Sequence, residues 1–194
     1  MNSERKRIYT LCLCILPLMV CSGLVYSMFS LYLFEVVKLT KTQIGLLYMV
    51  GSAMGLFFGP MLGRLSDRFG RKPVILACLA SFAVIFVGYA LGRSYAILFP
   101  IQILEGTTWV AIGAASTAYI ADSISSSNRG WAMGVYQQVA SVGWVIGPAV
   151  GGFLSDAIGS STTFLMGAAL VAVGLVLALF FVKEPERKPA GDGA

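Results

Sequence analysis

Glu105 is the strongest candidate for a side chain that does chemistry, because it is the one charged residue between positions 94 and 121. A stretch of that length can cross a bilayer as a helix. A rise of ~1.5 Å per residue then places Glu105 roughly 15 Å from the end near Tyr95. Ionisable side chains at such depth are functional candidates, since removal from water disfavours a charged carboxylate. Three roles are open: a proton-exchange site, a contact for a cationic substrate, or a structural hydrogen bond to another helix.

Polar and aromatic residues on other turns could line a water-filled cavity with Glu105. On its own stretch, those at helical spacing share one face; they are Gln102, Trp109, Gly113, Ser116 and Tyr119. A second set, on the stretch 130–155, comprises Gln137, Ser141 and Trp144. This set is predicted either to line the cavity or to join helices through polar contacts. Weaker candidates of the same kind near the start of the chain are Ser22, Tyr26 and Ser30.

The elements that must position these residues are six apolar segments. The chain of 194 residues is 57% hydrophobic and 12% charged, whereas a soluble domain carries about 25% charged residues. The predicted spans are residues 8–34, 42–63, 73–92, 94–121, 130–155 and 157–182. Each has the ~20 residues that a spanning helix needs. We therefore expect an all-α membrane protein whose six helices satisfy their own backbone hydrogen bonds.

Basic residues indicate the side of the membrane on which each connection lies. If residues 1–7 and 183–194 are cytoplasmic, eleven of the 14 Lys and Arg residues lie on the cytoplasmic side. This bias obeys the positive-inside rule and predicts a plasma-membrane protein with both termini inside. Residues 183–194 would form a tail or the start of an interdomain linker. The net charge of +5 then reflects contacts with anionic lipid, and no basic stripe with interleaved aromatics indicates nucleic acid.

A motif near the middle of the chain is repeated near its end. Gly63-x-Leu-Ser-Asp-x-x-Gly70 returns as Gly152-x-Leu-Ser-Asp-x-x-Gly159, and a Gly-Pro pair precedes each copy. The first copy is strongly basic and the second carries no Lys or Arg, as expected if they face opposite sides of the membrane. Spans one to three and four to six are therefore predicted to be inverted copies of one three-helix unit.

Residues of the basic copy of the motif, 63–70, are expected to form a turn and polar contacts. Gly63 and Gly70 are expected to permit a tight turn and close backbone approach. Asp67 would lie at the start of that turn, where its carboxylate could cap a helix. It could also pair with Arg71, four residues further on.

Glycines at four-residue spacing mark the fifth predicted span. Gly143, Gly147 and Gly151 form one stripe, and small residues at that spacing let two helices approach closely. Pro148 removes a backbone hydrogen bond and permits a kink. With Gly152 these residues give the pattern Gly-x-x-x-Gly-Pro-x-x-Gly-Gly. The pattern fits ordinary helix packing and also a sealed pathway wall.

The segment Gly63–Pro73, Gly-Arg-Leu-Ser-Asp-Arg-Phe-Gly-Arg-Lys-Pro, resembles the signature loop between helices two and three of the major facilitator superfamily. The resemblance covers essentially the whole chain, and the glycine pattern of the fifth span is similar to that of the family's proton-coupled antiporters, including drug exporters. It implies alternating-access transport of a small organic solute, with proton-coupled efflux as one form. The family usually has arginine at the position of Gln102 and glutamine at that of Glu105, so the hypotheses for Glu105 depend on its depth alone.

The resemblance also implies a conformational latch at the cytoplasmic end. In the family, the aspartate and arginine of the signature loop join an acid at the inner end of helix four and stabilise the outward-facing state. The corresponding residues here are Asp67, Arg71 and Asp122, with Gly63 and Gly70 shaping the loop. Separating such a cluster would shift a two-state equilibrium between inward-facing and outward-facing forms.

Enzymatic, channel and cofactor-dependent functions are disfavoured. The chain has no histidine, which removes a Ser-His dyad and most zinc sites. No phosphate-binding loop is present, and the paired Asn-Pro-Ala turns of a water or glycerol channel are missing. The four cysteines fall inside the predicted spans and are expected to be apolar fillers. No metal and no cofactor is expected.

The number of helices limits what one chain can do. Carriers of the resembling family contain two six-helix halves with the pathway between them, whereas six spans are predicted here. We expect a truncated carrier, a homodimer, or a partner that supplies the second bundle, with a non-transporting membrane subunit as the alternative. The expected partners are the lipid bilayer and a small-molecule substrate. In a lone bundle the polar face with Glu105 would be turned to lipid.

Overall fold

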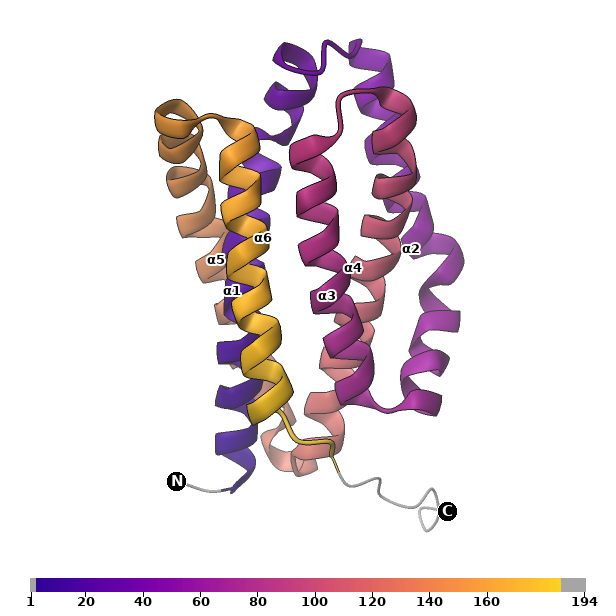
Figure 1. Cartoon of the computed structure of the whole chain (residues 1–194). Helices are drawn as coiled ribbons and strands as arrows, with labels where there is room; N and C mark the ends of the chain where they lie inside the picture. The colour runs from indigo at the N-terminus through magenta and orange to yellow at the C-terminus, as the bar shows by residue number, and fades with distance from the viewer. Residues whose placement is uncertain (1–2, 186–194) are drawn as a thin grey trace.

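In a computed structural model the chain forms a bundle of six long helices (Figure 1). The structure describes residues 3–185. The helices are α1 Ser3–Glu35, α2 Lys41–Phe69, α3 Arg71–Leu91, α4 Tyr95–Ser123, α5 Arg129–Ile158 and α6 Ser160–Phe181, with a short 3-10 helix, η1, at Ser126–Asn128. All six long helices in this part of the chain are long and apolar enough to cross a membrane. The predicted all-α fold of six transmembrane helices is confirmed.

Single glycines end α2 and α5 at matching points of the repeat. Gly70 and Gly159 have φ angles of +100° and +84°, which L-residues with a Cβ adopt only at a steric cost. The backbone N–H of Gly70 donates to the carbonyl of Ser66 at 3.1 Å, and that of Gly159 donates to the carbonyl of Ser155 at 3.0 Å. The repeated motif therefore makes the same backbone break at opposite ends of the bundle.

Gly63 does not form a turn, so the prediction for this residue is wrong. It lies inside α2, which continues through the charged segment to Phe69. One glycine in a helix interior costs only ~1 kcal/mol, whereas the positive φ of Gly70 interrupts a helix. The connection between α2 and α3 is therefore the single residue Gly70, and the predicted span 42–63 ends too early.

The helices pack as two interlocked three-helix units. The main contacts join α1 to α5 and α2 to α4, while α3 and α6 lie against each other beside both pairs (Figure 1). Exchanging the units α1–α3 and α4–α6 converts the first pair into the second, as inverted repeats require. The pairs α1–α5 and α2–α4 thus each join one helix of the first unit to one helix of the second.

Glycines bring α5 into backbone contact with α1. A Cβ on Gly147 would lie 2.6 Å from a backbone carbonyl oxygen of α1. Gly143 and Gly151 face the backbone of α1 in the same way. Pro148 lies between them inside α5 without ending the helix. Gly152 differs, because a Cβ there would meet no atom within 4 Å.

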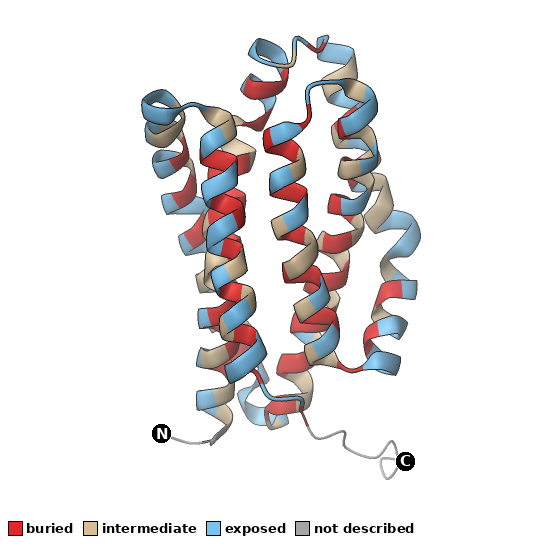
Figure 2. Cartoon of the chain, in the orientation of Figure 1, coloured by how far each residue is buried: buried red, intermediate tan, exposed pale blue. Residues whose placement is uncertain are grey.

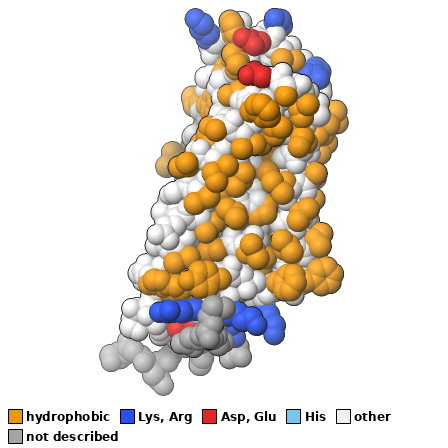
Figure 3. All heavy atoms as spheres, turned by 90° about the vertical axis from the view of Figure 1, so that its left-hand side faces the viewer, with side chains coloured by type: hydrophobic (Ala, Val, Ile, Leu, Met, Phe, Trp, Pro, Cys, Tyr) orange, Lys and Arg blue, Asp and Glu red, His pale blue; other side chains and the backbone are white. Residues whose placement is uncertain are grey.

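The surface of the bundle is hydrophobic over most of its height. Hydrophobic side chains cover the side view, and charged side chains lie near the two ends (Figure 3). The most hydrophobic window of α1 is 67% buried, compared with 11% for α2 and 17% for the span that contains α5. Buried residues gather where the helices face each other (Figure 2). The outer faces of α2 and α5 must therefore contact lipid or another apolar surface.

Candidate functional site

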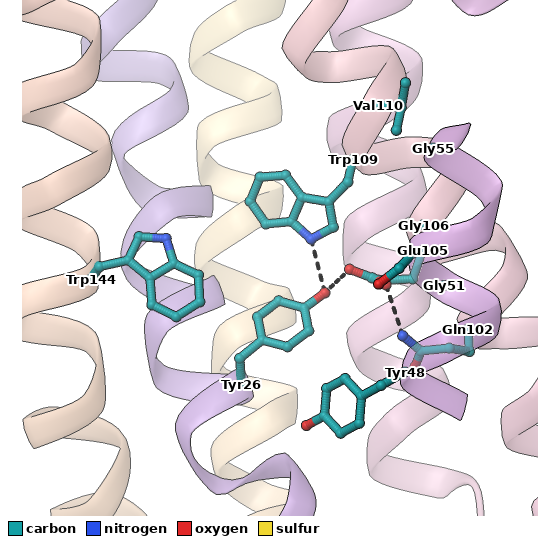
Figure 4. Close-up of a pocket in the computed structure, with 11 residues that line it drawn as sticks. Tyr26, Tyr48, Gly51, Gly55, Gln102, Glu105, Gly106, Trp109, Val110 and Trp144 are labelled. Atoms are coloured by element: carbon teal, nitrogen blue, oxygen red, sulfur yellow. Dashed lines mark hydrogen bonds between the residues drawn. The ribbon is translucent and has the colours of Figure 1, made fainter. Parts of the chain in front are cut away.

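A cavity of about 330 Å³ lies between α1, α2, α4 and α5 beside Glu105. The aromatic and polar side chains that line it include Tyr26, Tyr48, Gln102, Glu105, Trp109 and Trp144 (Figure 4). They come from four helices and from both three-helix units. The cavity therefore depends on the packing between the units and cannot exist within one of them.

Glu105 is buried inside the bundle, which corrects the expectation that it would be turned to lipid. Its surface is 4% exposed, and each carboxylate oxygen accepts a hydrogen bond (Figure 4). The hydroxyl of Tyr26 on α1 donates to Oε1. The amide Nε2 of Gln102, one turn away on α4, donates to Oε2 at 3.0 Å. The bundle itself therefore provides the partners of this carboxylate.

Tyr26 connects Glu105 to the aromatic wall of the cavity. Its hydroxyl oxygen accepts a hydrogen bond from Nε1 of Trp109 at 2.9 Å while donating to Glu105. Its ring stacks on Trp144 of α5, with the centroids 6.2 Å apart and an interplanar angle of 18°. The sequence marked Tyr26 as a weaker candidate, because its position on the first span did not indicate that it faces Glu105.

Gln102 is oriented from two sides. The hydroxyl of Tyr89 on α3 donates to Oε1 of Gln102 at 2.9 Å. This contact fixes the acceptor end of the amide, so its donor end faces Glu105. Sequence reasoning did not find Tyr89, since the residue lies in an apolar span with no local pattern around it. Its role appears only where α3 meets α4.

Two glycines that the sequence did not single out place α2 directly on α4. A Cβ on Gly106 would meet the backbone of Gly51, and a Cβ on Gly51 would lie 2.7 Å from Nε2 of Gln102. Both residues line the cavity (Figure 4). A sequence signal existed, because Gly51, Gly55 and Gly59 have the same four-residue spacing as the glycine stripe of α5.

Gln137 and Ser141 do not line the cavity. Both are exposed on α5, and Oγ of Ser141 donates to the carbonyl of Gln137 at 2.9 Å within the same helix. Trp144, predicted on the same face, does reach the wall of the cavity and is 50% exposed. Its large ring extends to Tyr26 and stacks on it.

The rest of the predicted face of α4 leads away from the cavity. Ser116 and Tyr119 are buried, and the position of Gly113 would leave a Cβ free of contacts within 4 Å. The hydroxyl of Tyr119 donates to the carbonyl of Lys183 at 2.9 Å. This part of the face therefore holds the segment after α6 in place. Ser22, on α1, donates to a carbonyl of its own helix at 2.7 Å.

A charged cluster joins α2, α3 and α4 at the end of the bundle where both termini lie. Nη1 of Arg71 lies 2.6 Å from Oδ1 of Asp67, and its Nε lies 2.9 Å from Oδ2 of Asp122. Nη1 also donates to Oγ of Ser66 at 3.2 Å. A planar guanidinium suits such bridging of two carboxylates. The structure thus brings together the three residues grouped by the resemblance, and their role as a latch stays a prediction.

Glu184 adds a third acid beside Asp67 and Asp122, and sequence reasoning missed it. Its two carboxylate oxygens accept the backbone N–H groups of Arg71 at 2.6 Å and Lys72 at 2.7 Å. The first N–H groups of a helix have no partner within it, and an acid there also interacts favourably with the helix dipole. Glu184 therefore caps α3. It was missed because it lies 113 residues from Arg71 in the chain.

Replacing Arg71 by glutamine is expected to loosen the junction of α2 and α3. Asp67 and Asp122 would lose their shared partner, at a cost of roughly 1–2 kcal/mol, between the values for exposed and buried ion pairs. Hydrogen exchange of the backbone amides around Gly70 should become faster. Arg64→Gln is the matched control, since Arg64 is an exposed arginine on α2, near the same junction. Equal exchange in the two variants would show that the cluster does not stabilise the junction.

Membrane-spanning helices in inverted three-helix units, with a polar cavity between them, form an architecture that many membrane transporters share. The sequence model of the Major Facilitator Superfamily matches residues 11–194. The chain belongs to this superfamily and is a multi-pass membrane protein.

Curated relatives of the chain include bacterial resistance proteins. It is 33% identical over 164 residues to multidrug resistance protein 1 of Bacillus subtilis (strain 168), covering 79% of this chain and 42% of that protein. It is 37% identical over 148 residues to the class C tetracycline resistance protein of Escherichia coli, covering 75% of this chain and 37% of that protein. The chain therefore spans about two fifths of the length of these relatives.

A solved structure shows the same fold. The structure of a bacterial homologue of the human lysosomal transporter Spinster, in an inward-facing and occupied conformation, matches with a TM-score of 0.81 and 18% identity. The match covers 96% of this chain and 46% of that one. The described helices therefore correspond to one six-helix half of a transporter of this superfamily.

Proposed function

We propose that this chain forms one half of a carrier that exports a small organic solute by alternating access, with the cavity beside Glu105 as its binding site. The main support is that the buried carboxylate of Glu105, which accepts hydrogen bonds from Tyr26 and Gln102, lies on the wall of an aromatic cavity. Carriers with inverted repeats bind their substrates near the middle of the membrane, where an ionisable side chain is a functional candidate. Relatives named for multidrug and tetracycline resistance support export.

The walls of the cavity favour an aromatic organic cation as substrate. Trp109, Trp144, Tyr26 and Tyr48 present aromatic rings to it, and aromatic faces attract cations that have left water. Glu105 supplies the compensating negative charge. A proton and the cation then compete for one carboxylate, which couples export of the cation to entry of a proton. In this scheme Glu105 is both the proton-exchange site and the contact for the substrate. The hydrogen bonds from Tyr26 and Gln102 hold its carboxylate in place.

A second six-helix bundle completes the pathway. Apolar side chains such as Leu56 on α2 and Val145 on α5 are 78% and 75% exposed, and the relatives are more than twice as long as the matched region. The charge bias of the connections between helices supports a plasma-membrane protein with both termini in the cytoplasm.

In that orientation the Asp67–Arg71–Asp122 cluster lies on the cytoplasmic side, where it acts as a latch and stabilises the outward-facing state.

The binding proposal can be tested with tetraphenylphosphonium, an aromatic cation, and the chain in nanodiscs. We expect saturable quenching of tryptophan fluorescence, because Trp109 and Trp144 line the cavity. Trp131 is the internal control, since its ring packs against Tyr9 instead. The quenching amplitude should fall in Trp109→Phe and Trp144→Phe and persist in Trp131→Phe. Equal loss in all three variants, or quenching without saturation, would contradict the proposed site.

Native mass spectrometry of the same sample tests whether a second copy of this chain supplies the second bundle. We expect the mass of one chain, 20.7 kDa, because the matched relatives extend well beyond the region shared with this chain. A stable mass of two chains would contradict a separate second bundle. It would show instead that a second copy of this chain covers the exposed faces of α2 and α5.

A further inference from the structure

A second pocket, of about 280 Å³, lies between the beginning of α1 and the end of α6. The residues that line it are Lys6, Arg7, Thr10, Tyr119, Phe181 and Lys183. Three of these side chains are cations, and they come from both ends of the described chain. In the side view, Lys and Arg side chains gather directly below the hydrophobic surface at this end of the bundle (Figure 3). The pocket therefore lies where a bilayer meets water.

The acidic residues described at this end of the bundle have other partners. Glu4 accepts the backbone N–H of Ser125 at 3.1 Å. Glu184 caps α3, as described above. Asp67 and Asp122 both pair with Arg71. The pocket thus gathers three positive charges while the nearby carboxylates contact other groups, which is the composition of an anion site.

Hydrogen bonds to its backbone give the pocket a fixed frame. Tyr119, which is 1% exposed, donates to the carbonyl of Lys183 and ties this residue to α4. Thr10 donates to the carbonyl of Lys6 at 2.8 Å. Lys183 therefore extends from a backbone position that α4 holds, and Lys6 extends from a turn of α1 to which Thr10 adds a hydrogen bond. An anion entering the pocket would find its cationic partners already gathered.

The apolar rim of the pocket points to the source of the anion. Phe181 lines it and is 62% exposed, and the adjacent Phe180 is 77% exposed. A soluble anion would gain nothing from these rings, whereas an acyl chain would cover them. Basic pockets between transmembrane helices can bind the head groups of anionic lipids.

We propose that this pocket binds the phosphate of an anionic phospholipid, with Lys6, Arg7 and Lys183 around the phosphate and the acyl chains along Phe180 and Phe181. The bound lipid would hold the beginning of α1 next to the end of α6. The proposal is independent of the transported substrate, because it involves neither Glu105 nor the cavity around it.

The test is native mass spectrometry of the delipidated chain titrated with phosphatidylglycerol and, separately, with phosphatidylcholine. We expect the first phosphatidylglycerol to bind at least about tenfold more tightly than phosphatidylcholine, since basic residues at the membrane surface attract anionic lipid. The variant Arg7→Gln/Lys183→Gln should lose most of that preference. The charge-matched control is Arg64→Gln/Arg129→Gln, at two exposed arginines outside the pocket.

Each alternative outcome overturns the proposal in a different way. Equal loss of preference in the two double variants would mean that anionic lipid binds through diffuse surface charge. Equal affinity for both lipids in the wild type would mean that the pocket does not select charge. Competition by millimolar glycerol phosphate or inorganic phosphate would show that its ligand is a soluble anion. A thermal unfolding scan of each variant confirms that the lipid readings come from folded protein.

Discussion

Replacing Gly147 by leucine is expected to prevent α5 from packing on α1 and to cause the largest loss of stability of any single change considered for this chain. A Cβ there would lie 2.6 Å from a backbone carbonyl oxygen, and a backbone cannot rotate away as a side chain can. Overpacking in a core usually costs 1–3 kcal/mol, and we expect about 3 kcal/mol here. Gly147→Ala should already be destabilising, because the clash begins at Cβ.

Thermal unfolding can be followed through the buried cysteines. Cys12, Cys14, Cys21 and Cys78 are buried, so a thiol-reactive dye labels them only as the helices separate. The matched control is Gly152→Leu, since a Cβ at Gly152 meets nothing within 4 Å. Its unfolding temperature should stay close to that of the wild type. Equal temperatures for the leucine variants of Gly147 and Gly152 would contradict the close contact of α1 and α5.

Replacing Glu105 by glutamine is expected to abolish the pH dependence of cation binding. A glutamine can still accept a hydrogen bond from Tyr26, so the fold should be kept, but it cannot exchange a proton or balance a positive charge. Loss of a charged hydrogen-bond partner corresponds to 1.5–3 kcal/mol, which means about a tenfold or greater loss of affinity for tetraphenylphosphonium. In the wild type, affinity should rise with pH, because protons and the cation compete for the carboxylate.

Tryptophan quenching gives the affinity for the cation at each pH. Binding curves at steps of about one unit from about pH 5 to about pH 9 measure how this affinity depends on pH. Glu35→Gln is the control, since Glu35 is exposed at the end of α1. It should bind the cation with wild-type affinity and wild-type pH dependence. If Glu105→Gln binds as tightly as the wild type at every pH, Glu105 is a structural residue and the proposed exchange is wrong.

The effects expected at Gly147 and at Glu105 are linked through α1. The glycine stripe of α5 sets how closely α1 approaches, and α1 carries Tyr26 to the carboxylate. A smaller residue than leucine at position 147 could therefore weaken cation binding before it unfolds the chain. Measuring both quantities on Gly147→Ala would separate the position of α1 from its stability.

Hydropathy and charge along the chain were enough to predict six helices, whereas the repeated Gly-x-Leu-Ser-Asp-x-x-Gly motif predicted their inverted repeat and the resemblance of Gly63–Pro73 to a signature loop indicated the family. These features are local, because a spanning helix requires a continuous apolar run and a glycine with positive φ ends a helix wherever it occurs. The same reasoning placed Gly63 in a turn, and this was wrong, since a helix tolerates one glycine at small cost. The pairing of Arg71 with Asp122 came from the family resemblance and not from local pattern.

Only the tertiary structure decided which side chains meet. In a membrane, lipid is as apolar as the core, so hydrophobic periodicity does not tell the face of a helix that packs from the face that contacts lipid. For this reason the sequence could not place Glu105 against Tyr26, turn Gln137 and Ser141 away from the cavity, or bring Glu184 to the start of α3. The sequence alone determined which segments cross the membrane, and the packing of glycines between those segments determined where the polar side chains lie.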